Sequence, residues 1–140
     1  MPKVNMQWKG GYCFEADLDG HKILVDLPEE SGGNNLGPTP MLLLLPSLAT
    51  CSAVGVVGIL KKMRVPEFKL NIVVDADKTP EHPKYYSKID VYYNFNGEGL
   101  NPKKLRKAVA VSEERYCGVN LMLSKTAEIN SIITINGEEV

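Results

Sequence analysis

The sequence of 140 residues predicts one α+β domain over residues 1–140, with mostly antiparallel strands. Runs that alternate polar and apolar residues, which are typical of half-buried strands, gather at the start, in the middle and at the end of the chain. Between the first two groups lies a run of twenty-one residues without a charge, Pro40 to Leu60, which predicts a long helix. A chain of this length can bury a hydrophobic core without disulfides.

Three antiparallel strands are predicted at the amino end, over residues 4–9, 12–17 and 22–27. Gly10-Gly11 turns the chain after the first strand, and Asp19-Gly20 is a hairpin signal after the second. Residues 31–40 are rich in glycine, asparagine and proline and predict a loop.

The charge-free run predicts a helix with Thr39 as N-cap and Pro40 at its first position, ending before Val65-Pro66. Its length would allow it to span a bilayer. Pro46 and the small polar residues of the run argue against that, and we expect a helix buried on all sides in a soluble protein with no membrane partner. A monomer of this size offers little cover for such a helix, so we expect a homodimer formed through it.

The rest of the chain is predicted to form strands at residues 68–76 and 89–95, a helix after Asn101-Pro102, a short helical piece from Cys117-Gly118, and a strand at 129–136. Helices thus separate three groups of strands, which is the pattern of an α+β fold.

The composition excludes several classes of function. Seventeen acidic and sixteen basic residues give a net charge of −1, and no segment concentrates enough basic residues to favour nucleic acid as a partner. The amino end lacks a signal-peptide pattern, so a cytoplasmic protein is expected. His21 and His82 have no partners at ligand spacing, and we expect no metal and no other cofactor.

The three cysteines are odd in number and lack a short C-x-x-C spacing, so neither a disulfide framework nor a zinc site is indicated. Cys51 lies in the middle of the charge-free run, where Gly55 and Gly58 on the same helix face leave space beside the sulfur. Cys117 lies at a predicted helix start, where backbone N–H groups stabilise a thiolate. Cys13, in an amphipathic strand, is interpreted as structural. Spacing alone leaves open that all three are ordinary buried cysteines.

Several segments resemble the OsmC/Ohr family of organic hydroperoxide reductases. Residues 37–45 (GPTPMLLLL), Cys51, and residues 56–63 (VVGILKKM) are similar to the central helix of that family. The second block of the family resembles His82-Pro83, residues 89–95 and 108–112, and Tyr116-Cys117-Gly118-Val119. The resemblance covers nearly the whole chain.

This resemblance implies an intertwined homodimer in which antiparallel sheets wrap around two long central helices. It also implies that Cys51 is the peroxidatic thiol, which is oxidised to a sulfenic acid while an organic hydroperoxide is reduced to an alcohol. Cys117 would be the resolving thiol that forms a disulfide with Cys51, and a dithiol reductant would restore both.

One departure from the family pattern concerns the charge beside the thiolate. The best-understood branch pairs the reactive thiolate with an arginine from the amino-terminal strands, held by a glutamate at the start of the central helix. Here no arginine precedes Arg64, Tyr12 follows the two glycines, and Met41 stands where the acidic residue belongs. Arg115, a lysine or a helix terminus are the candidate substitutes. The alternative function is a non-catalytic module that binds an apolar or acyl ligand at the dimer interface.

Overall fold

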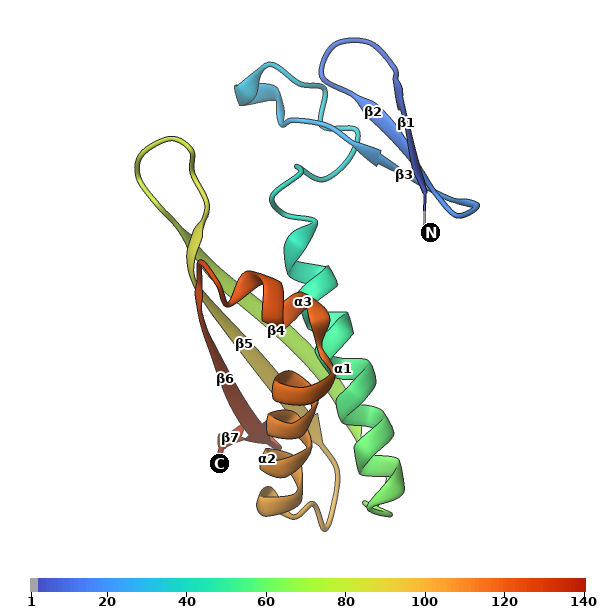
Figure 1. Cartoon of the computed structure of the whole chain (residues 1–140). Coiled ribbons are helices and arrows are strands. Elements are labelled where there is room, and N and C mark those ends of the chain that lie inside the picture. The colour runs from blue at the N-terminus through green and yellow to red at the C-terminus, as the bar shows by residue number, and fades with distance from the viewer. Residues whose placement is uncertain (1–2) are drawn as a thin grey trace. The chain divides into compact units, whose positions relative to one another are not determined.

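The computed structural model describes residues 3–140, which form two compact units, the first ending at Leu44 and the second beginning at Leu45 (Figure 1). The first unit holds a three-stranded sheet, and the second holds the long helix, a four-stranded sheet and two shorter helices. The predicted α+β class is confirmed, as is the predicted order of elements as far as residue 135, but the short last strand, Glu138–Glu139, was not predicted. That residues 1–140 act as one domain stays a prediction.

The first unit contains strands β1 (Val4–Trp8), β2 (Phe14–Leu18) and β3 (His21–Val25), paired antiparallel in the order β1-β2-β3. The predicted hairpin between β2 and β3 is present. Asp19 and Gly20 both have positive φ, 56° and 92°, as a two-residue hairpin turn of type I′ requires. The turn chemistry of the sequence therefore sets the register of this sheet.

Asp26 organises the loop that follows β3 and contains a short 3-10 helix, η1 (Glu29–Ser31). This carboxylate is only 1% exposed and accepts backbone hydrogen bonds from Leu27 (2.7 Å), Asn34 (3.2 Å) and Leu36 (3.2 Å). Gly33 packs so closely on the backbone that follows β3 that an added Cβ would lie 2.0 Å from the Leu27 carbonyl oxygen. The loop is thus folded around one buried charge.

We expect Asp26→Asn to destabilise the first unit at neutral pH. Burial raises the pKa of Asp26, but the three backbone donors outweigh it and leave the pKa below its usual value of 3.8. A carboxylate with a lowered folded pKa contributes stability above the unfolded pKa and loses it as the pH falls through the folded pKa. The difference between the urea unfolding midpoints of the parent and the variant should therefore become smaller below about pH 4.

Urea unfolding followed by the fluorescence of Trp8, the single tryptophan, measures this effect in the right unit. Asp19→Asn is the matched control, because it removes the same charge from an exposed turn position that asparagine also tolerates. A gap between parent and Asp26→Asn that stays constant from pH 7 to pH 3 would contradict the prediction.

The long helix α1 (Leu44–Lys62) begins four residues later than predicted. Residues 40–43 form turns, and the Thr39 hydroxyl accepts from the Leu42 N–H (3.4 Å), so Thr39 caps a turn and not the helix. The reason is Pro46, which has no N–H and whose ring clashes with the carbonyl four residues earlier, so it is tolerated only in a first helical turn.

The predicted end of α1 is close to the observed one. Arg64 has a positive φ of 56°, its N–H bonds to the Lys61 carbonyl (3.1 Å), and the Val65 N–H bonds to the Leu60 carbonyl (3.2 Å). These two bonds form a Schellman motif, which satisfies carbonyls that a helix end otherwise leaves free.

The second unit's sheet has the order β4-β5-β6-β7, with strands β4 (Lys69–Lys78), β5 (Tyr86–Asn96), β6 (Glu128–Ile135) and β7 (Glu138–Glu139). Three helical segments, α2 (Pro102–Val111), η2 (Ser112–Tyr116) and α3 (Gly118–Leu123), connect β5 to β6. Because this long connection crosses over, β5 and β6 are parallel, the one exception to the predicted antiparallel pairing.

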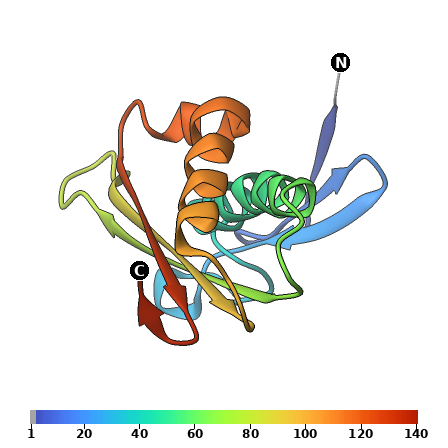
Figure 2. The same cartoon turned by 90° about the horizontal axis from the view of Figure 1, so that it is seen from below.

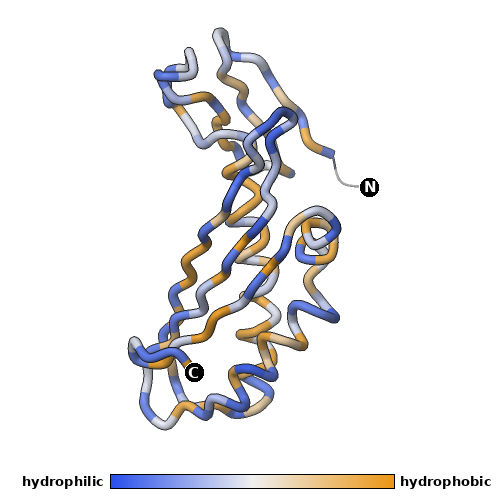
Figure 3. The backbone as a smooth tube through the Cα atoms, turned by 90° about the vertical axis from the view of Figure 1, so that its left-hand side faces the viewer, coloured by the Kyte–Doolittle hydropathy of each residue, from blue (hydrophilic) through white to orange (hydrophobic). Residues whose placement is uncertain are grey.

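The core of the second unit lies between this sheet and its helices. On β5, alternate residues Ile89, Val91, Tyr93 and Phe95 are buried, as the period of two predicted. Figure 2 shows α1 and α2 on one face of the sheet, and Figure 3 shows hydrophobic and hydrophilic residues alternating along its strands.

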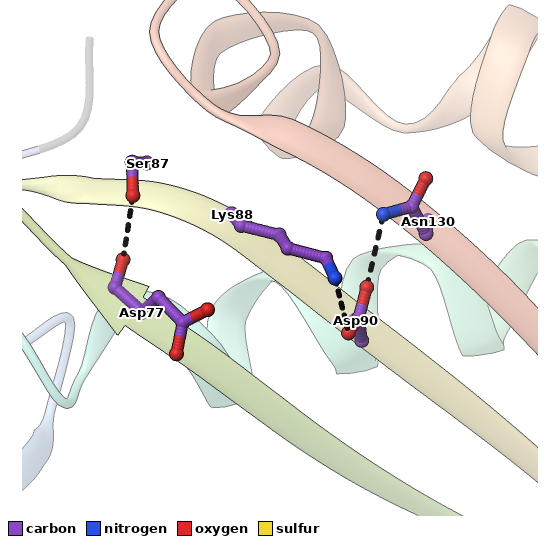
Figure 4. A network of polar contacts seen from close by, with 5 residues as sticks. All are labelled: Asp77, Ser87, Lys88, Asp90 and Asn130. Carbon is purple, nitrogen blue, oxygen red and sulfur yellow. Dashed lines mark hydrogen bonds and ion pairs between the residues drawn. The ribbon is translucent and has the colours of Figure 1, made fainter.

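The other face of the sheet carries polar pairs across β5 and β6. Asn130 donates to Asp90 (3.0 Å), and Lys88 of β5 lies 3.5 Å from the same carboxylate (Figure 4). Thr134 donates to Asn94 (2.8 Å). The Asn130–Asp90 and Thr134–Asn94 pairs join residues directly opposite each other in the parallel register and hold it in place.

Burial of α1 on all sides, as predicted, is not found in the single chain. The buried side chains follow one face, Leu45, Leu48, Ser52, Val56 and Leu60. Val54, on another face, is 69% exposed. Among residues 3–140, α1 alone is long and apolar enough to cross a membrane by length and composition, which is weak evidence because core helices of soluble proteins pass the same test.

Candidate active site

The two predicted site cysteines lie together in the second unit. Cys51 is on α1 and partly exposed, while Cys117 is buried at the N-cap of α3. The Cys117 side chain lies close enough to Cys51 to lower the pKa of its thiol. Cys13 is buried in the first unit. The sixty-five residues between Cys51 and Cys117 therefore fold so that these two thiols face each other.

The surroundings shift the two thiols in opposite directions. The Cys117 side chain and the backbone N–H groups of Val119 and Gly118 lower the pKa of Cys51, and together they exceed the opposing effect of burial. Burial raises the pKa of Cys117, although the Asn120 N–H donates to its sulfur (3.3 Å). The sequence predicted that N–H groups at the start of α3 would stabilise a thiolate on Cys117. The Asn120 N–H does donate to Cys117, but burial outweighs it and leaves the pKa of Cys117 raised. The N–H groups of Gly118 and Val119 instead lower the pKa of Cys51.

The segment before Cys117, η2, is a π-helical turn, a geometry often found at functional sites. Its first residue, Ser112, donates to the Ser52 carbonyl of α1 (2.7 Å). A Cβ on Gly55 would lie 2.2 Å from the Ser112 hydroxyl. The space expected beside Cys51 at Gly55 is therefore filled by Ser112, whereas a Cβ on Gly58 would meet no atom within 4 Å.

Side chains that the sequence did not predict complete the site. Tyr93 of β5 donates to Glu113 of η2 (2.8 Å), and Ser131 of β6 donates to the same carboxylate oxygen (2.5 Å). The Ser52 hydroxyl is buried and makes no hydrogen bond of regular geometry, but it faces both Tyr93 and Cys117. One signal was available: Tyr93 falls on the buried face of its strand, and a buried tyrosine hydroxyl needs a partner.

A surface hollow of about 360 Å³ lies beside Cys117 and is lined by residues of η2 and α3, including Glu113, Arg115 and Tyr116. Arg115 is exposed to solvent there. Of the candidate substitutes for the family arginine, the helix terminus is the one that acts on Cys51, through the N–H groups of Gly118 and Val119. Residues 3–140 hold no cluster of three or more side chains that could bind a metal ion.

Comparison with known proteins identifies the family. The model of the family described as OsmC-like protein matches residues 32–131, a range that includes both Cys51 and Cys117. The chain belongs to the OsmC-like family. The protein YhfA of Escherichia coli K12 is 30% identical to it over 128 residues, covering 91% of this chain and 92% of YhfA.

Solved structures agree with this OsmC-like assignment. A hypothetical protein from Aquifex aeolicus is 29% identical, with a TM-score of 0.82 over 97% of this chain and 96% of that one. A Legionella pneumophila protein named as the organic hydroperoxide resistance protein OsmC is 17% identical, with a TM-score of 0.68 over 96% of both chains. At that identity the likeness is one of fold, and it confirms two sheets and a long helix.

Proposed function

We propose that this OsmC-like protein is a thiol-dependent peroxidase that reduces organic hydroperoxides to alcohols. The observation that carries the proposal is the contact between Cys51 and Cys117, in which the more exposed thiol has the lowered pKa and the buried one has the raised pKa. A peroxidatic thiol must ionise and meet its substrate, whereas a resolving thiol needs only to reach its partner.

The reaction follows from this arrangement. The Cys51 thiolate attacks the distal oxygen of the hydroperoxide, the O–O bond breaks, and the leaving alkoxide takes up a proton to become the alcohol. The Cys117 sulfur then attacks the Cys51 sulfenic acid, a disulfide forms, and hydroxide leaves as water. A dithiol reductant returns both cysteines to the thiol state and is itself oxidised to a disulfide.

Related proteins support the choice of substrate. Solved OsmC-like structures similar in fold include proteins named for organic hydroperoxide resistance from Legionella pneumophila and Bacillus subtilis. Membership of the OsmC-like family and the soluble fold also support a cytoplasmic location and a link to oxidative stress.

The proposal includes a homodimer. Val54 is exposed on α1, next to a hollow of about 390 Å³ lined by Ala53, Val57, Gly58 and Lys61. In the first unit, every residue of β1 is exposed, although the strand carries apolar side chains. Exposed apolar surface of this extent is typical of a protein–protein interface, and a second copy would cover it.

The alternative, a non-catalytic module for an apolar or acyl ligand, is favoured by the same hollow on α1 and by the neutral groups around Cys51. A ligand that stays bound through purification, together with no disulfide after peroxide treatment, would support it. A complete Cys51–Cys117 bond after one equivalent of peroxide would count against it.

The test of the proposed function is the consumption of cumene hydroperoxide in the presence of dithiothreitol. We expect Cys51→Ser to abolish it, because no other thiol has both the lowered pKa and the exposure. Cys13→Ala, which removes a buried cysteine of the other unit, is the matched control and should retain parental activity. If Cys51→Ser consumes peroxide as fast as the parent, the proposal is wrong.

A further inference from the structure

We propose that Ser52, Tyr93 and Glu113 form a proton relay that carries the proton of Cys117 to solvent when Cys117 attacks oxidised Cys51. The inference rests on the proposed function, because it concerns the step that forms the disulfide. It gives a role to a buried hydroxyl network that the two-cysteine scheme leaves unused.

Neighbouring side chains lead from Cys117 towards solvent. The Ser52 hydroxyl faces the Cys117 thiol on one side and the Tyr93 hydroxyl on the other. Tyr93 in turn donates to the Glu113 carboxylate over 2.8 Å. Glu113 lines the hollow beside Cys117, so the path ends at solvent.

The Ser52 hydroxyl is the unusual member of this path. It is 1% exposed and has no hydrogen bond of regular geometry, an unfavourable condition that calls for an explanation. The Ser112 hydroxyl donates to the Ser52 carbonyl, which holds the backbone without engaging the Ser52 hydroxyl. A hydroxyl is both donor and acceptor, so that of Ser52 can accept a proton from Cys117 and donate its own to Tyr93.

Cys117 needs such a path because it is buried. Its pKa is raised by burial and by the neighbouring Cys51, so few molecules carry a Cys117 thiolate at neutral pH. The titratable groups that face it are Cys51 of α1 and, through Ser52, Tyr93 of β5, while Glu113 of η2 faces Tyr93. Burial and the Glu113 carboxylate also raise the pKa of Tyr93, so its hydroxyl stays protonated and passes protons without lasting ionisation.

The step balances as follows. The Cys117 sulfur bonds to the Cys51 sulfur, the S–O bond of the sulfenic acid breaks, and the hydroxide that leaves takes a proton from solvent to become water. The Cys117 proton moves to the Ser52 oxygen, the Ser52 proton to Tyr93, and the Tyr93 proton to Glu113, which returns it to solvent. Cys117 is oxidised to the disulfide and the sulfenic acid is reduced.

The experiment measures this step without peroxide. Reduced full-length protein carrying Cys13→Ala is mixed with excess dithiobis(nitrobenzoate), which forms a mixed disulfide with Cys51 and releases one coloured thiolate. Attack by Cys117 on the Cys51 sulfur then releases a second, at a rate independent of reagent concentration. We compare the rate of this second release between pH 6 and 9 in the parent and in three variants, Ser52→Ala, Tyr93→Phe and Glu113→Gln. Tyr92→Phe, on the opposite face of β5, is the control.

We expect the three relay variants to slow the second release about 100-fold at pH 7, the lower end of what general-base assistance contributes. Their rates should rise about tenfold per pH unit, because only solvent-formed thiolate then attacks. Tyr92→Phe should behave as the parent. Glutamine at position 113 can still accept a hydrogen bond from Tyr93 but cannot act as a base. A parental rate and pH profile for Glu113→Gln would therefore overturn the relay. A parental rate for Ser52→Ala would overturn it as well. If the parent fails to reduce peroxide, the proposed function falls, while the exchange reaction still decides on the relay.

Discussion

Gly55→Ala is expected to destabilise the second unit and to separate its two thiols. The new Cβ would lie 2.2 Å from the Ser112 hydroxyl and 3.1 Å from the Ser112 Cβ, so rotation of the serine alone cannot relieve the clash. Alanine gains about 1 kcal/mol of helix stability over glycine. Overpacking costs about 1–3 kcal/mol, and losing the buried bond from Ser112 to Ser52 costs about 1–3 kcal/mol more. The net free energy of unfolding should fall by about 1–5 kcal/mol.

The same shift should slow disulfide formation. Ser112 begins η2, which leads directly to Cys117, so moving η2 away from α1 moves Cys117 away from Cys51. A misplacement of about 1 Å can cost roughly a hundredfold in rate. Thermal unfolding and the rate of Cys51–Cys117 disulfide formation after one equivalent of peroxide measure the two effects.

Gly58→Ala is the control, because its Cβ meets nothing within 4 Å in the chain and should only gain helix stability. Gel filtration of both variants separates these effects from any change in subunit association. The double variant Gly55→Ala/Ser112→Ala should recover part of the loss, because it removes the closest atom of the clash. Strictly additive effects of the two substitutions would contradict this explanation.

Cys117→Ser is expected to stop the proposed catalytic cycle after its first step. Cys51 keeps its backbone donors Gly118 and Val119 and should still be oxidised by one equivalent of hydroperoxide per chain. The sulfenic acid should then accumulate. It must wait for a dithiol from solution, whereas in the parent Cys117 already lies beside Cys51. Turnover with millimolar dithiol should fall about a hundredfold.

Trapping with dimedone followed by mass spectrometry measures the sulfenic acid directly. The parent should show little adduct because its disulfide forms first, and Cys13→Ala should match the parent. Parental turnover in Cys117→Ser, without any dimedone adduct, would show that Cys117 does not resolve Cys51.

Local patterns in the sequence were enough to predict the strands and most helix ends. Alternation along residues 89–95 predicted the buried face of β5, the Asp19-Gly20 turn predicted its hairpin, and Asn101 caps α2 through its side chain (2.9 Å from the Lys103 N–H). These features depend on residues a few positions apart, which is why a sequence contains them. The late start of α1 was also local, and Pro46 was given too little weight as a helix-breaking residue.

The candidate site was predicted only in part, for a physical reason. Cys51 and Cys117 could be chosen from their elements, but which of them has the lowered pKa depends on where the N–H groups of α3 point. Ser52, Tyr93 and Glu113 come from a helix, a strand and a π-helical turn, and no periodicity predicts that they meet.

By itself, the sequence determined the order of the elements, their buried faces and the two cysteines, because side-chain period and turn chemistry act between neighbours in the chain. Only the tertiary structure decided the parallel pairing of β5 with β6, the filling of the space at Gly55 by Ser112, and the placing of a helix terminus at Cys51. Each of these joins segments far apart in sequence, and their contacts are selected by the packing of the whole unit rather than by any local preference.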